Sequence, residues 1–405
     1  MPLVIVMVTS SYPRFPGDSV GTFMEPIAKS VAALGHEVHI VAPWHPLVTR
    51  PAREGGVHFH FYKYAPVGAL NVFGYAAALR ADVKLKGAAY LAAPLALAAG
   101  WRAARKVALK TGASVMHGHW VVPGGATAAA AAPGLPLVVS LHGSDVYVAE
   151  KLAPARQVAR TVFRRARAIT ACSSDLARRA IALGADPERI EVVPYGVDVE
   201  RFKPDSQARA ELRTRVGVEP NRLMLFSAGR LVRKKGFEYL IDAVALIPPS
   251  ERPMLVLAGD GDLRAELESR AAAVSDSVRL VGNQTQDEVG RWLAAADIVA
   301  VPSVRDDSGN VDGLPNVVLE ALASGTPLVT TPAGGIGSIV ESGRTGLLVA
   351  ERDPAGLAAA VGQLAASPDL RSRIGQAARA MVMERYGWER TARQLDGAYR
   401  RALAK

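Results

Sequence analysis

The sequence has little cysteine and no long uncharged apolar run. Cys172 is the only cysteine among 405 residues, which excludes a disulfide framework and cysteine-built zinc or iron–sulfur sites and fits a reducing compartment. The most apolar later stretch, residues 87–101, is too short to cross a bilayer. Residues 1–9 lack the basic start and small-residue cleavage site of a signal peptide, so we expect a buried strand there. These features predict a cytoplasmic protein.

Acidic charge is scarce in the first half. Residues 1–200 contain 21 Lys and Arg against 13 Asp and Glu, whereas residues 201–405 contain 27 against 25. Aromatic residues make up only 6% of the chain and rarely interleave with the basic ones. Because no recognition module is visible either, we do not expect nucleic acid as a partner.

Two segments contain most of the basic excess, residues 80–110 and 151–179. In the second, Arg156, Arg160 and Arg164 recur at every fourth position and form one ridge if the segment is helical. A basic ridge beside apolar turns suits the cytoplasmic face of an anionic membrane and a peripheral mode of binding. A solvated helix face is the alternative interpretation.

Apolar segments of strand length alternate with helical patterns along the chain. Strands are expected at residues 4–9, 38–42, 55–62, 115–119, 137–141, 168–172, 190–193, 223–228, 254–258, 278–281, 297–303, 328–331 and 347–349. Helices are expected at residues 22–34, 68–110, 124–132, 175–183, 237–246, 263–274, 286–295, 315–324, 354–365 and 376–405, with a break near residue 387. Repeated strand–helix units indicate parallel sheets with helices on both faces.

Residues 194–204 contain two prolines and a glycine, and they are typical of a linker. The fold class is therefore α/β, with two doubly wound domains at residues 1–198 and 199–385. Ligands of such sheets bind at the carboxyl ends of the strands. Because the polar loops occur at those ends, we expect the two domains to face each other across a cleft.

The loop and helix from Asp312 to Glu320 are the strongest local signal. Pro315 suits a first helical turn because its missing N–H would be unpaired there, and Gly325 suits the helix end. The free amides of such a helix attract anions. Two carboxylates at this place predict a site for a ligand that has both hydroxyls and phosphates. A weaker candidate cradle precedes Thr22, whose spacing to Glu25 is that of a capping box; a plain turn is its alternative.

Four motifs of the second half identify a resemblance. They are Gly229-Arg230-Leu231 with Lys235-Gly236, then Gly259-Asp260-Gly261, then Val281-Gly282-Asn283, and finally the stretch from Asp312 to Glu320 with Gly325-Thr326-Pro327. In this order they resemble the retaining glycosyltransferases of family 4, the sucrose-synthase-like group. The resemblance implies the GT-B architecture of two Rossmann-like domains, with residues 386–405 as a helix returning to the first domain. It implies transfer of a hexosyl group from a nucleotide diphosphate sugar without a metal or other cofactor.

The same resemblance implies roles for single residues. Arg230 and Lys235 would stabilise the charge that develops on the leaving diphosphate. Glu320 would accept hydrogen bonds from the ribose diol. Asp312 stands where Glu is commoner, and it would bind donor-sugar hydroxyls or support charge at the reacting carbon. His142 would contact the donor sugar near the acceptor.

Further contacts follow from matched positions. Donor contacts are expected at Gly21, Val281, Gly282, Asn283, Gly313, Leu314, Pro315, Asn316 and Val317, and acceptor-side contacts at His119, Trp120 and Asp145. Asp306 and Asp307 are adjacent and not spaced as a DxD metal motif, so no metal site is predicted there.

The predicted enzyme is a hexosyltransferase that uses a hydroxyl of a glycolipid or surface polysaccharide as acceptor, bound by the basic first domain. A sugar-nucleotide epimerase of the same fold is one alternative. A phosphorylase is another, although the pyridoxal lysine that it needs is not identifiable. The third alternative is a nucleotide-sugar-binding regulator without turnover, because Asp312 departs from the usual residue.

Overall fold

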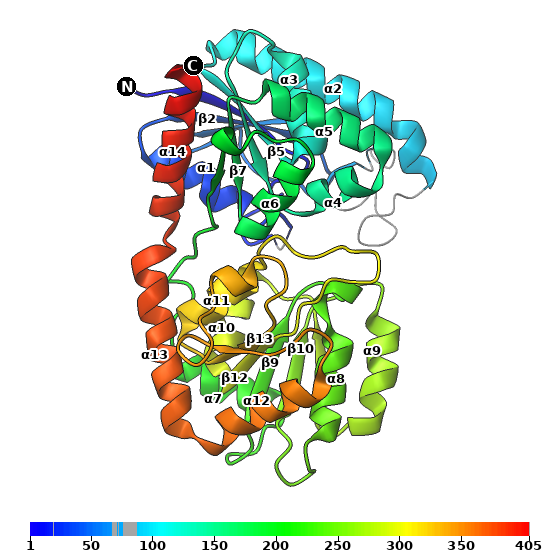
Figure 1. The fold of residues 1–405 in the computed structure, drawn as a ribbon, viewed down its shortest axis with the longest axis vertical. Helices are drawn as coiled ribbons and strands as arrows, with labels where there is room; N and C mark the ends of the chain where they lie inside the picture. The colour runs from blue at the N-terminus through cyan, green and yellow to red at the C-terminus, as the bar shows by residue number, and fades with distance from the viewer. Residues whose placement is uncertain (19, 67–70, 72, 76–86, 405) are drawn as a thin grey trace. The chain divides into compact units, whose positions relative to one another are not determined.

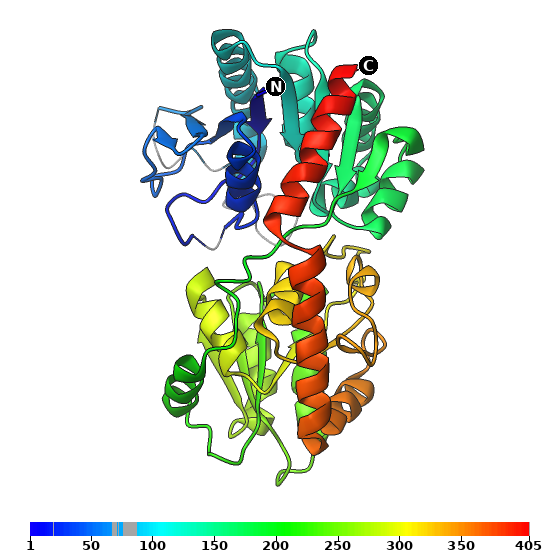
Figure 2. The ribbon, with the colours of Figure 1, turned by 90° about the vertical axis from the view of Figure 1, so that its left-hand side faces the viewer.

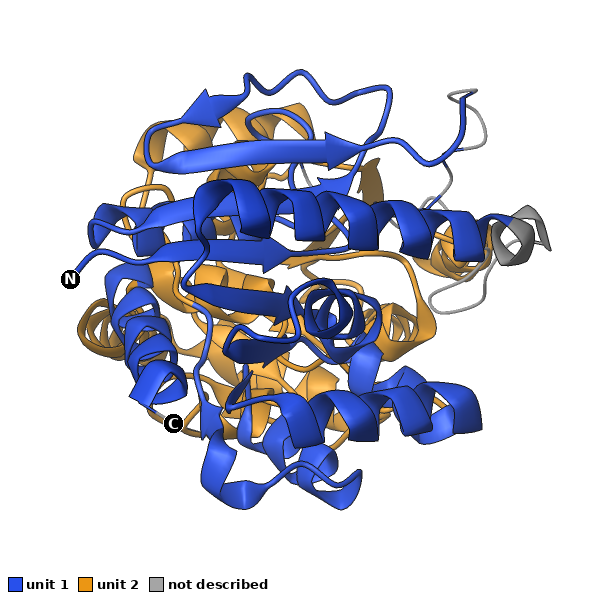
Figure 3. Ribbon diagram, turned by 90° about the horizontal axis from the view of Figure 1, so that it is seen from above, with its two compact units in different colours: residues 1–195, 388–405 blue, residues 196–387 orange. Residues whose placement is uncertain are grey.

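The chain consists of two compact α/β units (Figures 1 and 3). The computed structural model describes residues 1–18, 20–66, 71, 73–75 and 87–404. The first unit comprises residues 1–195 and 388–405, and the second comprises residues 196–387. Each unit has its own sheet, so the α/β class with two doubly wound domains is confirmed.

The sheet of the first unit has eight strands in the order β3-β4-β2-β1-β5-β6-β7-β8. Its strands are β1 Val4–Val8, β2 Glu37–Pro43, β3 Arg53–Glu54, β4 Val57–Tyr62, β5 Val115–His119, β6 Leu137–Leu141, β7 Ala168–Ala171 and β8 Ile190–Val192. All pairs are parallel except β3 with β4. The residues of β5, β6 and β7 are all buried, as expected for parallel strands covered on both faces.

Helices cover this sheet, and the last one comes from the other end of the chain. The helical segments are α1 Met24–Ala33, α2 Gly87–Thr111, η2 Trp120–Gly125, α3 Ala126–Ala131, α4 Ser144–Lys151, α5 Ala153–Arg165, α6 Ser174–Ala182, η3 Pro187–Arg189 and α14 Trp388–Ala404. Helix α14, red in Figure 2, packs against α1 and β7. His36 Nε2 lies 3.0 Å from Asp396 Oδ1, and His117 Nδ1 lies 2.8 Å from the Tyr399 hydroxyl. These contacts hold the C-terminal helix to the first unit.

The second unit has a parallel six-stranded sheet in the order β11-β10-β9-β12-β13-β14. Its strands are β9 Met224–Ala228, β10 Met254–Ala258, β11 Val278–Gly282, β12 Ile298–Val301, β13 Leu328–Thr330 and β14 Leu347–Leu348. Its helical segments are α7 Ser206–Arg215, η4 Arg233–Lys235, α8 Phe237–Leu246, α9 Arg264–Ala271, η5 Ala272–Val274, α10 Gln286–Ala295, α11 Asn316–Ser324, η6 Ile336–Ser338, α12 Pro354–Ala366 and α13 Pro368–Arg385. Among the described residues, no helix is both long and apolar enough to cross a bilayer.

Three sequence-based expectations for helices need correction. Helix α7 was not expected, although Asp205 caps it by accepting from the Ala208 amide at 2.9 Å. The segment expected as one helix at 124–132 begins earlier, at Trp120, and is interrupted at the non-helical Val122. Much of the helix expected from residue 68 lies outside the described residues.

The capping box expected at Thr22 is the third correction. Phe23 is the N-cap of α1 and no side chain caps it. The Glu25 carboxylate binds Lys29 and Arg50 instead, each at 2.6 Å. Two cations hold a carboxylate more strongly than a backbone amide does, because charge-assisted hydrogen bonds are the stronger kind.

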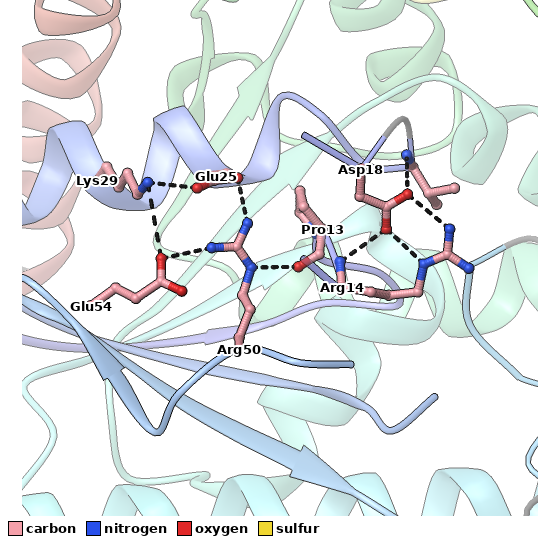
Figure 4. A network of polar contacts seen from close by, with 8 residues as sticks. Pro13, Arg14, Asp18, Glu25, Lys29, Arg50 and Glu54 are labelled. Atoms are coloured by element: carbon pink, nitrogen blue, oxygen red, sulfur yellow. Dashed lines mark hydrogen bonds and ion pairs between the residues drawn. The ribbon is translucent and has the colours of Figure 1, made fainter. Parts of the chain in front are cut away.

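Arg50 is the centre of a buried polar network in the first unit (Figure 4). Its guanidinium, which is fully buried, lies 2.6 Å from Glu25 and 2.6 Å from Glu54, and its Nε donates to the Pro13 carbonyl at 2.7 Å. It also lies 5.3 Å from the centre of the Tyr12 ring. One side chain therefore ties α1, β3 and the loop after β1 together.

Replacing Arg50 by Met should lower the free energy of unfolding of the first unit by about 3 kcal/mol, because two partly buried carboxylates lose their shared cation. Urea denaturation of the full chain measures this. Arg53→Met is the matched control, since Arg53 is exposed and its Nε donates to the uncharged Gly55 carbonyl at 2.8 Å. A loss of stability equal to that of the control would contradict this interpretation.

Candidate functional site

The loops after β9 and β10 of the second unit are held together by their backbones. The Leu231 amide donates to the Asp260 carbonyl at 2.9 Å, and the Leu263 amide donates to the Leu231 carbonyl at 3.0 Å. Gly259 has φ +144°, and a Cβ there would lie 1.9 Å from the Gly229 carbonyl oxygen. Only glycine fits this approach, so two of the sequence motifs form one packed surface at the carboxyl end of the sheet.

Asp312 pairs with two lysines of the loop after β9. Its carboxylate lies 2.6 Å from Lys235 Nζ and 3.1 Å from Lys234 Nζ. Burial alone would raise the pKa of Asp312, but the two ammonium groups outweigh burial and hold the pKa well below its usual range. The sequence analysis identified Lys235 as a site residue and missed Lys234. Two adjacent lysines give no indication in the sequence that both side chains contact the same carboxylate.

Helix α11 starts beside this cluster and contains Glu320. Pro315 is its N-cap, one position before the expected first turn, and Gly325 ends it in the left-handed conformation. Glu320 is 7% exposed, and burial raises its pKa to about 7, although a hydrogen bond with Gln286 and the charges of Arg201 and Lys235 oppose the rise. Lys235 therefore acts electrostatically on both predicted carboxylates.

The remaining predicted donor residues of this unit lie on loops and strand ends. Arg230 is exposed, in contrast to Lys234 and Lys235. The Gly282 carbonyl accepts from the Gly259 amide at 2.8 Å, and the Val281 carbonyl accepts from Gln284 Nε2 at 2.9 Å. The end of β11 is thus fixed next to the loop after β10.

Two acidic residues that could suggest a metal have other contacts. Asp306 Oδ1 accepts from the amides of Ser308 and Asn310, each at 2.9 Å, and so closes its own loop. Asp307 lies 2.8 Å from the guanidinium of Arg352. Both carboxylates are therefore engaged by partners within the protein.

In the first unit His142 lies in a cluster of aromatic and histidine rings after β6. Its Nδ1 is 2.7 Å from the Tyr195 hydroxyl and its Nε2 is 3.1 Å from His119 Nδ1. The Phe23 ring lies 4.8 Å away. Burial lowers the pKa of His142 to about 3, so its imidazole is neutral near pH 7. Because both nitrogens have partners, contact with a sugar requires one of these hydrogen bonds to be exchanged.

The other predicted residues of this unit have differing environments. His119 is completely buried and its Nδ1 lies 3.1 Å from His142 Nε2, so it is placed to orient that ring. Its acceptor-side contact stays a prediction. Asp145 is 3% exposed and accepts from the amides of Val121 and Gly143 at 2.8 and 2.9 Å, which fixes two loops. Trp120 is partly exposed and has φ +63°. Gly21 lies in the turn before α1, with φ +66°.

A largely apolar pocket of about 430 Å³ opens at the carboxyl ends of β1 and β5. Its lining includes Trp120, Val122 and Leu97, with Asp145 and Ser144 among its few polar groups. Pockets of this size and composition hold small organic ligands. Neither lysine nor arginine occurs among the described residues that line it.

Replacing Glu320 by Gln should stabilise the protein more at pH 8 than at pH 5. A carboxyl whose pKa rises on folding favours the folded state below its unfolded value of 4.5, and this stability is lost as the pH rises through about 7. The gain in unfolding free energy should therefore be about 2–3 kcal/mol larger at pH 8. Urea denaturation at both pH values measures it, with the exposed Glu251→Gln as control. An equal effect at both pH values would refute the shift.

Two family models and the curated relatives all indicate a glycosyltransferase. The model described as Glycosyltransferase Family 4 matches residues 20–201, and the model described as Glycosyl transferases group 1 matches residues 222–367. A D-inositol 3-phosphate glycosyltransferase of a Nocardioides species is 34% identical over 320 residues, covering 72% of this chain and 68% of that protein. One of the same description from Streptomyces bingchenggensis is 35% identical over 232 residues, which are 54% of this chain and only 49% of that relative.

Solved structures share the fold over nearly the whole length. Sucrose-phosphate synthase from Thermosynechococcus elongatus gives a TM-score of 0.78 at 20% identity, covering 99% of each chain. HepE from Anabaena in complex with UDP gives 0.75 at 20% identity, covering 98% of this chain and 99% of that one. Both likenesses are those of the GT-B fold. The chain belongs to the glycosyltransferases of family 4, within the group 1 glycosyl transferases.

Proposed function

We propose that the protein is a retaining hexosyltransferase that takes its sugar from a nucleotide diphosphate donor. The cluster of Lys234, Lys235 and Asp312 beside the start of α11 supports this proposal most directly. Two ammonium groups and the free amides of a helix start provide positive charge for a diphosphate. The UDP and UDP-glucose complexes of HepE concern that protein, and they make uridine donors a sensible first choice for assays.

In the proposed reaction the diphosphate gains negative charge as the glycosidic bond breaks. Lys235 and Arg230 stabilise that charge more in the transition state than in the ground state, which lowers the barrier. The departing phosphate oxygen accepts the proton of the incoming hydroxyl, which attacks from the same face and so retains the configuration. This chemistry uses neither a metal nor a covalent enzyme intermediate.

Asp312 has a second task in this proposal. Its carboxylate holds two ammonium groups at a fixed place when the donor is absent, which avoids the cost of ordering long flexible side chains during binding. Glu320, whose pKa is about 7, binds the ribose diol through its oxygens. A carboxylate accepts two hydroxyl hydrogen bonds, whereas the protonated form accepts fewer, so donor binding should strengthen as the pH rises through 7.

The proposed acceptor is a glycolipid or a lipid-linked surface polysaccharide. The apolar lining of the pocket beside Trp120 supports an acceptor with an apolar part. The described residues of that lining include no lysine or arginine, which does not favour a bare phosphate. The relatives named for D-inositol 3-phosphate therefore supply a second acceptor for any screen.

Peripheral binding to an anionic membrane is proposed from α5. Arg160 and Arg164 are exposed on this helix and, four positions apart, lie on the same face of it. Arg160 Nε donates to the Leu183 carbonyl at 3.2 Å and Arg164 donates to the Thr161 hydroxyl at 3.2 Å, and both of these partners are uncharged. A ridge of exposed basic side chains suits the surface of an anionic bilayer.

Replacing Arg230 by Ala should lower kcat about 10²–10³-fold, the usual loss for one donor that stabilises developing negative charge. Nucleotide release from UDP-, GDP- and ADP-sugars measures it. Arg233→Ala is the matched control from the same loop, because Arg233 is exposed and pairs with Glu266 at 2.7 Å. If both variants keep wild-type turnover, the site assignment is wrong; if the wild type binds donors without turnover, the protein is a binding protein.

Replacing Leu97 by Arg should raise the KM for an amphiphilic acceptor more than tenfold and leave donor hydrolysis without acceptor unchanged, because a charge would enter the apolar pocket. Leu95→Arg is the control, since Leu95 lies on the same helix, is 58% exposed and does not line the pocket. Equal KM values for the two variants would argue against an acceptor at this place.

Reversing charge with Arg160→Glu and Arg164→Glu should abolish co-sedimentation with anionic vesicles at low salt, because the attraction is electrostatic. The exposed Arg178→Glu on α6 serves as control. Binding that persists in the double variant, or that high salt leaves unchanged, would exclude this mode of association.

A further inference from the structure

Four side chains with metal-binding groups lie on one face of the first unit's sheet. Glu37 and His39 are two positions apart on β2, and His58 and His60 are two positions apart on β4. Strand residues two positions apart point to the same face. The parallel pairing places His39 opposite His58, so the two strands bring all four side chains together. None of these four residues belongs to the predicted transferase site, and their polar side chains are not needed to fill the apolar core.

The distances within the group are close to those of a coordination shell. Glu37 Oε1 lies 2.9 Å from His39 Nε2 and 3.8 Å from His58 Nε2. One ligand atom from each of these three residues lies within 4.8 Å of the other two. Zn²⁺ binds imidazole nitrogen at about 2.0–2.1 Å, so tetrahedral ligand atoms lie roughly 3.3 Å apart. Small side-chain rotations therefore convert the present arrangement into a three-ligand site.

His60 occupies the place of a residue that orients a ligand. Its Nε2 lies 3.0 Å from His39 Nδ1, the nitrogen of His39 that faces away from Glu37. Metal-binding histidines commonly use their second nitrogen to hydrogen-bond a partner that fixes the ring and the tautomer. With the proton on His39 Nδ1, its Nε2 is free to bind a cation.

The group is also accessible to an ion. The Glu37 side chain is 49% exposed and that of His58 is 26% exposed, whereas that of His39 is 4% exposed. Glu37 is the first residue of β2 and His58 the second of β4. Because both lie at the amino ends of their strands, the group is at the opposite edge of the sheet from the loop that contains His142.

We propose that Glu37, His39 and His58 bind one divalent transition-metal ion of the Zn²⁺ class, oriented by His60. Two imidazoles and one carboxylate form a ligand set that Zn²⁺ uses, with water at the remaining position. The bound ion joins β4, next to the sheet edge, to β2. Its effect is to stabilise the first unit, since a ligand that binds only the folded state shifts unfolding in proportion to its occupancy.

Calorimetric titration of the full-length protein with Zn²⁺ tests the proposal, after removal of any histidine tag and treatment with a chelator. Wild type should bind one equivalent and melt at a higher temperature with Zn²⁺. His58→Gln and Glu37→Gln should each weaken binding more than tenfold, and both sites are exposed enough to tolerate the change. His60→Gln should weaken it about 10–100-fold. His45→Gln, a histidine of the same unit outside the group, should match wild type.

Co²⁺ absorption provides a second readout. Wild type and His60→Gln should give the same ligand-field spectrum at saturation, whereas His58→Gln should alter it, because only the latter removes a ligand. Wild type that binds no Zn²⁺, or variants that bind it as tightly as wild type does, would overturn the proposal and leave an ordinary hydrogen bond between His39 and Glu37. Neither result would bear on the transferase proposal.

Discussion

The ion pairs of Asp312 with Lys234 and Lys235 connect the parts of the proposed donor surface. The lysines belong to the loop after β9, and the carboxylate belongs to the loop after β12. Lys235 and Asp312 are 77 residues apart in sequence. Gly334 approaches the Asp312 carbonyl so closely that a Cβ would lie 2.0 Å from it, so a third loop packs against the same residue. Removing this carboxylate would leave two ammonium groups facing each other at the start of α11.

The parallel sheet explains why such distant residues meet. Each crossover returns the chain to the same edge, so the loops after β9, β10 and β12 emerge side by side. The buried strands supply rigidity, because they are enclosed by helices on both faces and exchange backbone hydrogen bonds along their length. In the proposed function, specificity for the sugar and the base would depend on loop residues that the sheet holds in place, because the buried strand residues do not reach a ligand.

The sequence predicts most strands because they are short, mainly apolar and often bounded by glycine or proline, but it misses β3, which consists of the charged pair Arg53 and Glu54. It fails for α7, whose residues are mostly polar and bury only Ala208 and Leu212, so no apolar periodicity marks it. It also fails for side-chain direction. Lys234 and the group around His39 depend on which way a side chain turns and on strand register, and neither is visible in a linear pattern. The sequence likewise does not show that both ring nitrogens of His142 have hydrogen-bond partners, because His119 and Tyr195 meet it only in the folded chain.

The central claim is that this surface recognises a diphosphate through Lys235 and its neighbours. Calorimetric comparison of UDP with UMP binding to wild type and to Lys235→Met tests it most directly. The account predicts that wild type binds UDP at least tenfold more tightly than UMP, because the second phosphate adds charge-assisted hydrogen bonds, and that the variant loses most of this preference. Equal affinities of wild type for UDP and UMP, together with tight binding of either, would contradict it.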